Sequence, residues 1–180
     1  MVKKIVAIGP ESTGKSTLCE RLAIAYKTKY CPEFARDFLI RNGPHYSYDD
    51  LLTIAKGQLA LEDELTRNVE EANPGGSALL FVDTDMYVMK VWCEYVFGKC
   101  HSFILDQIAE RKYDFYLLCN TDIPWETDQL REYPTLAERQ ELFNMYKDLM
   151  VNQHTPWKIV TGSAEERIQQ AMSAVGTVLN

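Results

Sequence analysis

Apolar and polar positions along the chain follow two alternating patterns. Short apolar runs at residues 2–8, 78–82 and 113–119 are typical of strands buried on both faces of a sheet. Shorter apolar runs predict two further strands, at residues 29–31 and 158–161. Helical spacing of apolar residues separates several of these runs. Alternation of this kind predicts the α/β class: a P-loop kinase-like parallel sheet of about five strands with helices on both faces.

Three helical segments have clear boundaries in the sequence. One is expected at about residues 15–27, directly after a glycine-rich turn. A long one begins after Ser47 and ends at Asn73-Pro74-Gly75-Gly76. The last begins at Ser163, where Glu166 completes a capping box.

The chain length and one polar stretch define the expected organisation. With 180 residues, the chain has the size of one domain, so we expect a single P-loop kinase domain over residues 1–180. The charged stretch at about residues 121–139 has little apolar periodicity at its start. We therefore expect it to form a mobile lid.

Composition narrows the class of protein further. The chain is 46% hydrophobic and 25% charged, which is typical of a globular protein with a buried core. Its net charge of −7 disfavours a nucleic-acid partner. Five scattered cysteines without a C-x-x-C pair indicate reduced thiols, and no apolar run approaches the roughly 18 residues of a membrane span. We expect a cytoplasmic protein with no membrane partner, and the sequence leaves its oligomeric state open.

One motif predicts a nucleotide site. The pattern G-x-x-x-x-G-K-[ST] occurs between the first strand and the first helix, as Gly9-Pro10-Glu11-Ser12-Thr13-Gly14-Lys15-Ser16. In such a loop, successive N–H groups converge on the β- and γ-phosphates of ATP at a helix N-terminus. Because Pro10 has no N–H, the donors should come from the stretch between Ser12 and Thr17. We expect Lys15 to reach between the phosphates and the Ser16 hydroxyl to bind Mg²⁺.

Carboxylates follow two of the predicted strands. Asp83 ends an apolar run, and a carboxylate at the carboxyl end of a parallel strand points into the ligand crevice, where Asp83 would serve as a metal partner. For Asp85, substrate binding and stabilisation of a helix dipole are both open. Glu33 is suited to act as a base or to bind a sugar. A surface ion pair between Glu33 and Arg36 is the alternative.

The predicted lid contributes further candidates. Arg131 and Arg139 are each either a mobile arginine that neutralises the transferring phosphoryl group or part of a solvated charged helix. Trp125 lies in a polar stretch and needs an apolar surface to cover, which is either the core or a ligand ring.

Taken together, these motifs resemble the ribosylnicotinamide kinase domain of the NadR type. The P-loop at residues 9–16, Pro-Glu-Phe-Ala-Arg-Asp at 32–37 and Asp-Thr-Asp at 83–85 have counterparts there in the same order and at similar spacing. So does the stretch at 125–131, together with Arg139. The similarity extends from the first strand to about residue 160.

The resemblance implies a small-molecule kinase that uses ATP and Mg²⁺. Its γ-phosphoryl group would pass to the 5′-hydroxyl of nicotinamide riboside and give nicotinamide mononucleotide, a step of NAD salvage. The implied catalytic residues are Lys15, Glu33, Asp83 and Arg131. The implied ligand contacts are Gly9, Ser12, Thr13, Gly14, Ser16, Thr17 and Arg139 for ATP, Ser16 and Asp83 for the metal, and Glu33, Arg36, Asp85 and Trp125 for the substrate.

Two departures from the family limit what carries over. Full-length NadR proteins also have an adenylyltransferase domain and often a DNA-binding domain upstream, so we do not extend dinucleotide synthesis or transcriptional regulation to this chain. Gln129 stands where the family commonly has glycine, which affects the expected flexibility of the lid. Two alternatives stay open: a kinase for another nucleoside or small alcohol, and a regulatory P-loop ATPase with a protein partner.

Overall fold

A five-stranded sheet forms the centre of the computed structural model, which describes residues 1–76 and 78–179. The strands lie in the order β2-β3-β1-β4-β5, and all pairings are parallel, which confirms the predicted α/β class. Their carboxyl ends therefore meet at one edge of the sheet. The strands are β1 (Val2–Ile8), β2 (Lys29–Cys31), β3 (Ala78–Asp83), β4 (Phe115–Cys119) and β5 (Trp157–Val160).

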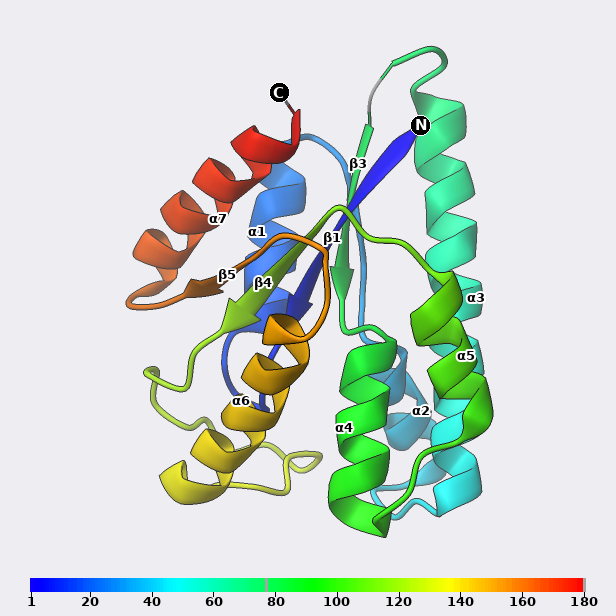
Figure 1. Cartoon of the computed structure of the whole chain (residues 1–180), viewed down its shortest axis with the longest axis vertical. Coiled ribbons are helices and arrows are strands. Elements are labelled where there is room, and N and C mark those ends of the chain that lie inside the picture. Colours follow the sequence, from blue (N-terminus) through cyan, green and yellow to red (C-terminus); the bar gives the residue numbers. More distant parts are fainter. Residues whose placement is uncertain (77, 180) are drawn as a thin grey trace.

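Helices cover both faces of the sheet (Figure 1). Helices α1 and α7 lie on one face, and α3, α4 and α6 on the other. The helices are α1 (Lys15–Ala25), α2 (Phe34–Asn42), α3 (Tyr48–Ala72), α4 (Met86–Phe97), α5 (Ser102–Glu110), α6 (Leu136–Val151) and α7 (Ala164–Leu179). None of the helices within residues 1–76 and 78–179 has the length and apolar character of a membrane span.

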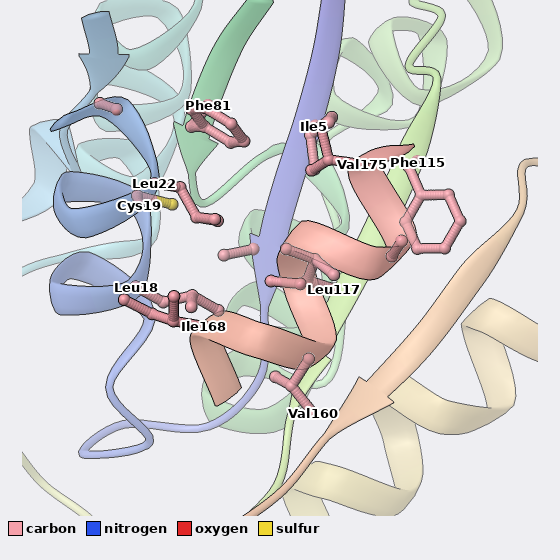
Figure 2. Close-up of a cluster of buried hydrophobic side chains, with 14 of the residues drawn as sticks. Ile5, Leu18, Cys19, Leu22, Phe81, Phe115, Leu117, Val160, Ile168 and Val175 are labelled. Carbon is pink, nitrogen blue, oxygen red and sulfur yellow. The ribbon is translucent and has the colours of Figure 1, made fainter. Parts of the chain in front are cut away.

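The two-residue period of the strands divides the core into two layers. In β1, Ile5 and Ala7 face α1 and α7, whereas Val6 and Ile8 face the opposite helices. Figure 2 shows the first layer, in which Leu22 of α1 lies close to Phe81 and other strand side chains. Burial of strands on both faces explains why their sequences read as continuous apolar runs.

A third apolar cluster lies beside the sheet rather than on it. Residues of α2, α3, α4 and α5 form it, among them Ala35, Leu51, Met86 and Ile104. This cluster packs the four helices together and places α2 and α4 at the carboxyl edge of the strands (Figure 1).

Helix starts follow the local sequence. The Ser47 and Asp50 side chains bond reciprocally to each other's backbone N–H at the start of α3. Ser163 and Glu166 do the same at the start of α7, as predicted.

Candidate active site

The predicted phosphate-binding loop forms one wall of a cavity of about 660 Å³ at the carboxyl edge of the sheet. Helices α2 and α4 and the segment between β4 and α6 form the other walls. We call this segment, residues 121–135, the lid segment; it contains no helix or strand. The predicted site residues that line the cavity are Gly9, Ser12, Thr13, Gly14, Lys15, Ser16, Thr17, Glu33, Arg36 and Arg131.

Glycine is required at the first position of the loop. Gly9 has a φ of 139°, and a Cβ atom there would lie 2.7 Å from the carbonyl oxygen of Cys119 in the neighbouring strand β4. Gly14, at the N-cap of α1, has a left-handed φ of 75°. The Lys15 ammonium donates a hydrogen bond to the carbonyl oxygen of Pro10 at 2.9 Å. The loop is thus folded around a lysine whose charge faces the cavity.

Asp83 lies beside this loop at the end of β3. Its side chain is 1% exposed, and neither carboxylate oxygen has a hydrogen-bond partner among the described residues. Burial raises the pKa of this carboxyl, although nearby Lys15 partly offsets the effect. A buried carboxylate without a partner fits a cation, and Mg²⁺ usually takes only one or two protein ligands beside phosphates and water. Asp83 and the Ser16 hydroxyl are therefore a fitting donor set for Mg²⁺.

Glu33 is an acidic residue of the cavity lining that follows β2. It occupies the N-cap position of α2, yet its carboxylate makes no capping hydrogen bond. Burial and the charge of Asp83 raise its pKa to about 7, while Lys15 acts in the opposite direction. A carboxylate that titrates near neutral pH beside a phosphate-binding lysine is suited to proton transfer.

Gln58 of α3 positions Glu33. Its Oε1 accepts a hydrogen bond from the N–H of Phe34 at 2.7 Å, and its Nε2 donates to the carbonyl oxygen of Pro32 at 3.3 Å. The side chain is 2% exposed, so these bonds fix the turn on either side of Glu33. We did not predict this role from the sequence. The available indication is a polar residue within the apolar stripe of a helix, between the buried Ala55 and Leu59.

The lid segment is bonded to the phosphate-binding loop. The Ser12 hydroxyl oxygen accepts from the N–H of Glu126 at 2.9 Å and from Nη1 of Arg131 at 3.3 Å. The Glu11 carboxylate accepts from the N–H of Glu132 at 2.9 Å. Arg131 therefore lies directly beside the loop that would hold phosphates.

The structure places Arg139 and Trp125 outside the cavity lining. Arg139 lies in the first turn of α6 and is 3% exposed, because this helix carries it into the core. Its guanidinium donates to the carbonyl oxygens of Ser12, at 2.9 Å, and of Ile123, at 3.2 Å. Arg139 is thus a buried support of the loop, and its expected contact with ATP stays a prediction. The Trp125 ring packs near the guanidinium groups of Arg139 and Arg131, at 5.8 and 5.9 Å, and is not part of the cavity lining.

Asp85 also has a different position from the one implied for a substrate ligand. It is 2% exposed and caps α4, with Oδ1 accepting from the N–H groups of Tyr87 and Val88. Oδ2 accepts from the Tyr116 hydroxyl at 2.9 Å. Burial raises the pKa of the Asp85 carboxyl to about 7. The geometry supports the helix-terminus alternative, and Asp85 is outside the cavity lining.

Arg167 of α7 is a cavity residue that we did not predict. It is 4% exposed and donates to the carbonyl oxygens of Thr13 and Gly162, both at 2.8 Å. It also pairs with Asp122 at the start of the lid segment. Arg139 and Arg167 therefore support consecutive loop residues from two different helices, a relationship that only the tertiary structure reveals.

A parallel sheet with this loop at the end of β1 and an acid at the end of β3 defines a P-loop nucleotide-binding protein. The family model described as AAA domain matches residues 4–167, and the chain belongs to this family.

Comparison with curated proteins confirms the resemblance to NadR. The chain is 28% identical over 153 residues to the trifunctional NAD biosynthesis/regulator protein NadR of Escherichia coli (strain K12) and 27% identical to the protein of the same description from Salmonella typhimurium. Each match covers 83% of this chain and 36% of the relative. The chain thus spans about a third of the length of these relatives.

Solved structures show the same fold. NadR protein in complex with NR superposes with a TM-score of 0.74 at 21% identity, over 98% of this chain and 49% of that one. NadR protein in complex with NAD and AMP-PNP gives a TM-score of 0.69 at 20% identity, over 98% of this chain and 49% of that one. Thymidylate kinase from Ehrlichia chaffeensis gives 0.62 at 14% identity, over 97% of this chain and 98% of that one. The fold is therefore that of the P-loop kinases.

Proposed function

We propose that this protein is an ATP-dependent kinase that phosphorylates the 5′-hydroxyl of nicotinamide riboside and forms nicotinamide mononucleotide. The observation that carries the proposal is the position of Glu33. Its carboxylate has a pKa of about 7 and faces, in one cavity, the lysine of a phosphate-binding loop.

ATP binding rests on the loop and on two positive side chains. The N–H groups between Ser12 and Thr17 bind the phosphates, with the α1 N-terminus adding a favourable dipole. Lys15 leaves the carbonyl oxygen of Pro10 for the β- and γ-phosphates. Arg131 neutralises the charge that develops on the transferred group.

Mg²⁺ is held by the Ser16 hydroxyl and by Asp83, directly or through water. When bound, it supplies positive charge to the phosphate oxygens. The absence of a hydrogen-bond partner for Asp83 among the described residues supports this assignment.

Glu33 completes the transfer. The acceptor oxygen forms a bond to the γ-phosphorus while the bond from that phosphorus to the β–γ bridging oxygen breaks. The acceptor proton passes to Glu33, and ADP leaves with the bridging oxygen. Gln58 keeps Glu33 in place throughout, because its bonds are to backbone groups that do not take part in the reaction.

Nicotinamide riboside is the acceptor that the cavity and the relatives favour. The acceptor side presents aromatic rings of Tyr46 and Trp92 and carboxylates of Glu33 and Glu132. A cationic pyridinium ring is stabilised by both kinds of group. The motifs shared with NadR, which has been solved in complex with NR, support the same choice.

A coupled ADP-release assay across nicotinamide riboside, adenosine, uridine and thymidine tests the proposal. We expect kcat/KM for nicotinamide riboside to be at least about tenfold higher, a difference of about 1.4 kcal/mol that one good ring contact supplies. The Lys15→Ala variant is the control for the ATP site. Loss of the lysine ammonium should raise the activation barrier for phosphoryl transfer by about 3–4 kcal/mol. Preference for another nucleoside would overturn the acceptor assignment, and ADP release without any acceptor would overturn the kinase assignment.

We further propose that the chain acts as one domain in the cytoplasm. All five cysteines are free thiols in the described structure, which is consistent with a reducing compartment.

A further inference from the structure

Each arginine in the cavity lining has a carboxylate partner. The four pairs are Arg21–Glu165 at 2.8 Å, Arg36–Asp128 at 2.7 Å, Arg131–Glu126 at 3.9 Å, and Arg167–Asp122. Lys15 differs, since no carboxylate of the described residues lies within 4 Å of its ammonium group. The cavity therefore offers strong positive charge at the phosphate-binding loop and mostly neutralised charge elsewhere.

The Arg36–Asp128 pair belongs to the same cavity lining as Glu33. Arg36 is in the first turn of α2, three residues after Glu33, and its charge lowers the pKa of Glu33. Asp128 comes from the lid segment and joins α2 across the cavity. Its Oδ1 also accepts a hydrogen bond from the N–H of Leu130 at 2.9 Å, so the carboxylate is held in place from its own segment.

Charge at this position decides which acceptors can bind. A phosphate monoester on the acceptor would occupy the space beside Glu33, where the reacting hydroxyl otherwise lies. Such a group carries a charge of about −1.5 to −2 at neutral pH and needs an unpaired arginine for strong binding. Here Arg36 is already paired with Asp128, and the carboxylates of Glu33 and Glu132 repel an anion.

We propose that Asp128 is a specificity-determining residue, which masks Arg36 so that the cavity accepts nucleosides and rejects nucleoside 5′-monophosphates. This inference rests on the proposed function, in which a nucleoside hydroxyl is the acceptor. The same masking weakens the hold on the product, because the product carries its new phosphate beside Arg36.

The Asp128→Asn variant tests the proposal. Asparagine keeps the size of the side chain and an oxygen for the N–H of Leu130 but loses the charge that neutralises Arg36. Binding is measured calorimetrically on protein saturated with Mg²⁺ and a non-hydrolysable ATP analogue. The probes are two matched pairs: nicotinamide riboside with nicotinamide mononucleotide, and uridine with uridine 5′-monophosphate.

We expect the wild-type protein to bind each monophosphate at least about tenfold more weakly than its nucleoside, and Asp128→Asn to reduce that ratio by about tenfold. An unchanged ratio would overturn the proposal, as would wild-type affinity for monophosphates equal to that for nucleosides. Binding is measured for both pairs, so the two proposals can fail separately. A preference for uridine would contradict the proposed acceptor, while the ratio of uridine to uridine 5′-monophosphate binding would still test the role of Asp128.

Two further variants separate masking from general changes in charge. Glu165→Gln frees Arg21, which lies on α1 rather than on α2, and it should leave the ratio unchanged. Adding Arg36→Gln to Asp128→Asn should abolish the gain in monophosphate binding. If Glu165→Gln produces the same gain, or the double variant retains it, Arg36 is not the masked group. Circular dichroism confirms that each variant is folded.

Discussion

Three carboxyl side chains near the phosphate-binding loop differ in burial and in hydrogen bonding. Asp83 is buried and has no hydrogen-bond partner among the described residues, Asp85 is buried with both oxygens bonded, and Glu33 is half-buried beside the cavity. The environment of each carboxyl group separates a metal ligand, a helix cap and a proton acceptor that look alike in the sequence.

The first residue-scale prediction concerns pH. Glu33 can accept a proton only when ionised, so kcat/KM should rise with pH through about 7 and level off above it. Glu33→Gln should lower kcat by about 10²–10⁴-fold and remove this limb of the profile. Initial rates between pH 5.5 and 9 measure both effects, with Glu132→Gln as the control that keeps the limb. A pH-dependent limb that survives in Glu33→Gln would assign the base to another group.

The second residue-scale prediction concerns Mg²⁺. Asp83→Asn should raise the Mg²⁺ concentration for half-maximal activity by about tenfold, because it removes a negative charge from the metal site. Asp85→Asn should leave this concentration unchanged, since that carboxylate is already bonded to backbone N–H groups and Tyr116. Titration of Mg²⁺ at fixed ATP measures the difference. Equal shifts in the two variants would show that Asp83 is not the metal partner.

At this scale the sequence predicts residues whose type and spacing define the chemistry. The P-loop and Asp83 belong to this group, because the motif is local and the acid directly ends an apolar run. Gln58, Arg139 and Arg167 act on backbone groups of segments distant in the sequence, so no local pattern reveals which groups they bind.

Among the elements, α4 depends most clearly on one side chain. Asp85 caps its first turn, and Val88, Val91 and Trp92 of this helix line the cavity. The position of the cavity wall therefore follows from a buried carboxylate.

The stability of the protein should consequently depend on pH through Asp85. Its pKa in the folded protein, about 7, lies above the ordinary value of 3.8, so the folded state binds the proton more tightly than the unfolded state. This contribution to the free energy of unfolding is complete below pH 4 and is lost as the pH rises to 7. Asp85→Asn should reduce the decline between pH 4 and 7, which urea denaturation measures. The same slope in both proteins would contradict the assignment.

Arg131 of the lid segment and Arg139 of α6 should differ in a measurable way. Arg139→Met leaves the buried carbonyl oxygen of Ser12 without this donor, at about 1–3 kcal/mol, and also removes the bond to the partly buried Ile123, so it should lower the free energy of unfolding. Arg131→Met should leave stability nearly unchanged and lower kcat more than it raises the KM for ATP. Denaturation and steady-state kinetics on both variants check this contrast, and equal losses of stability would contradict it.

Strands β3 and β4 are predictable because both of their faces are buried and their sequences are continuously apolar. The boundary between the lid segment and α6 is harder to predict from the sequence, since α6 begins within a charged stretch. The informative pattern is Thr135 followed by Glu138, a capping box that the structure confirms at the start of α6. Its presence explains why Arg139 belongs to a helix.

At the scale of the whole molecule, the parallel sheet brings separate segments to one edge. The loop after β1, Glu33 after β2, Asp83 at the end of β3 and the lid segment after β4 meet there because all strands run in one direction. The sequence predicts this convergence in outline. It does not predict the cluster of α2, α3, α4 and α5, because its contacts join residues far apart in the chain.

The bonds from Ser12 and Glu11 to the lid segment have a kinetic consequence. They tie the lid segment to the phosphate-binding loop, so a triphosphate that enters the loop must displace backbone N–H groups of the lid segment from Ser12 and Glu11. ATP can bind only after these bonds have broken. The association rate constant should therefore lie below the diffusion limit, and the observed rate of binding should level off at high ATP concentration. A protein built in this way discriminates against brief collisions, since only a nucleotide present at the moment of opening can enter.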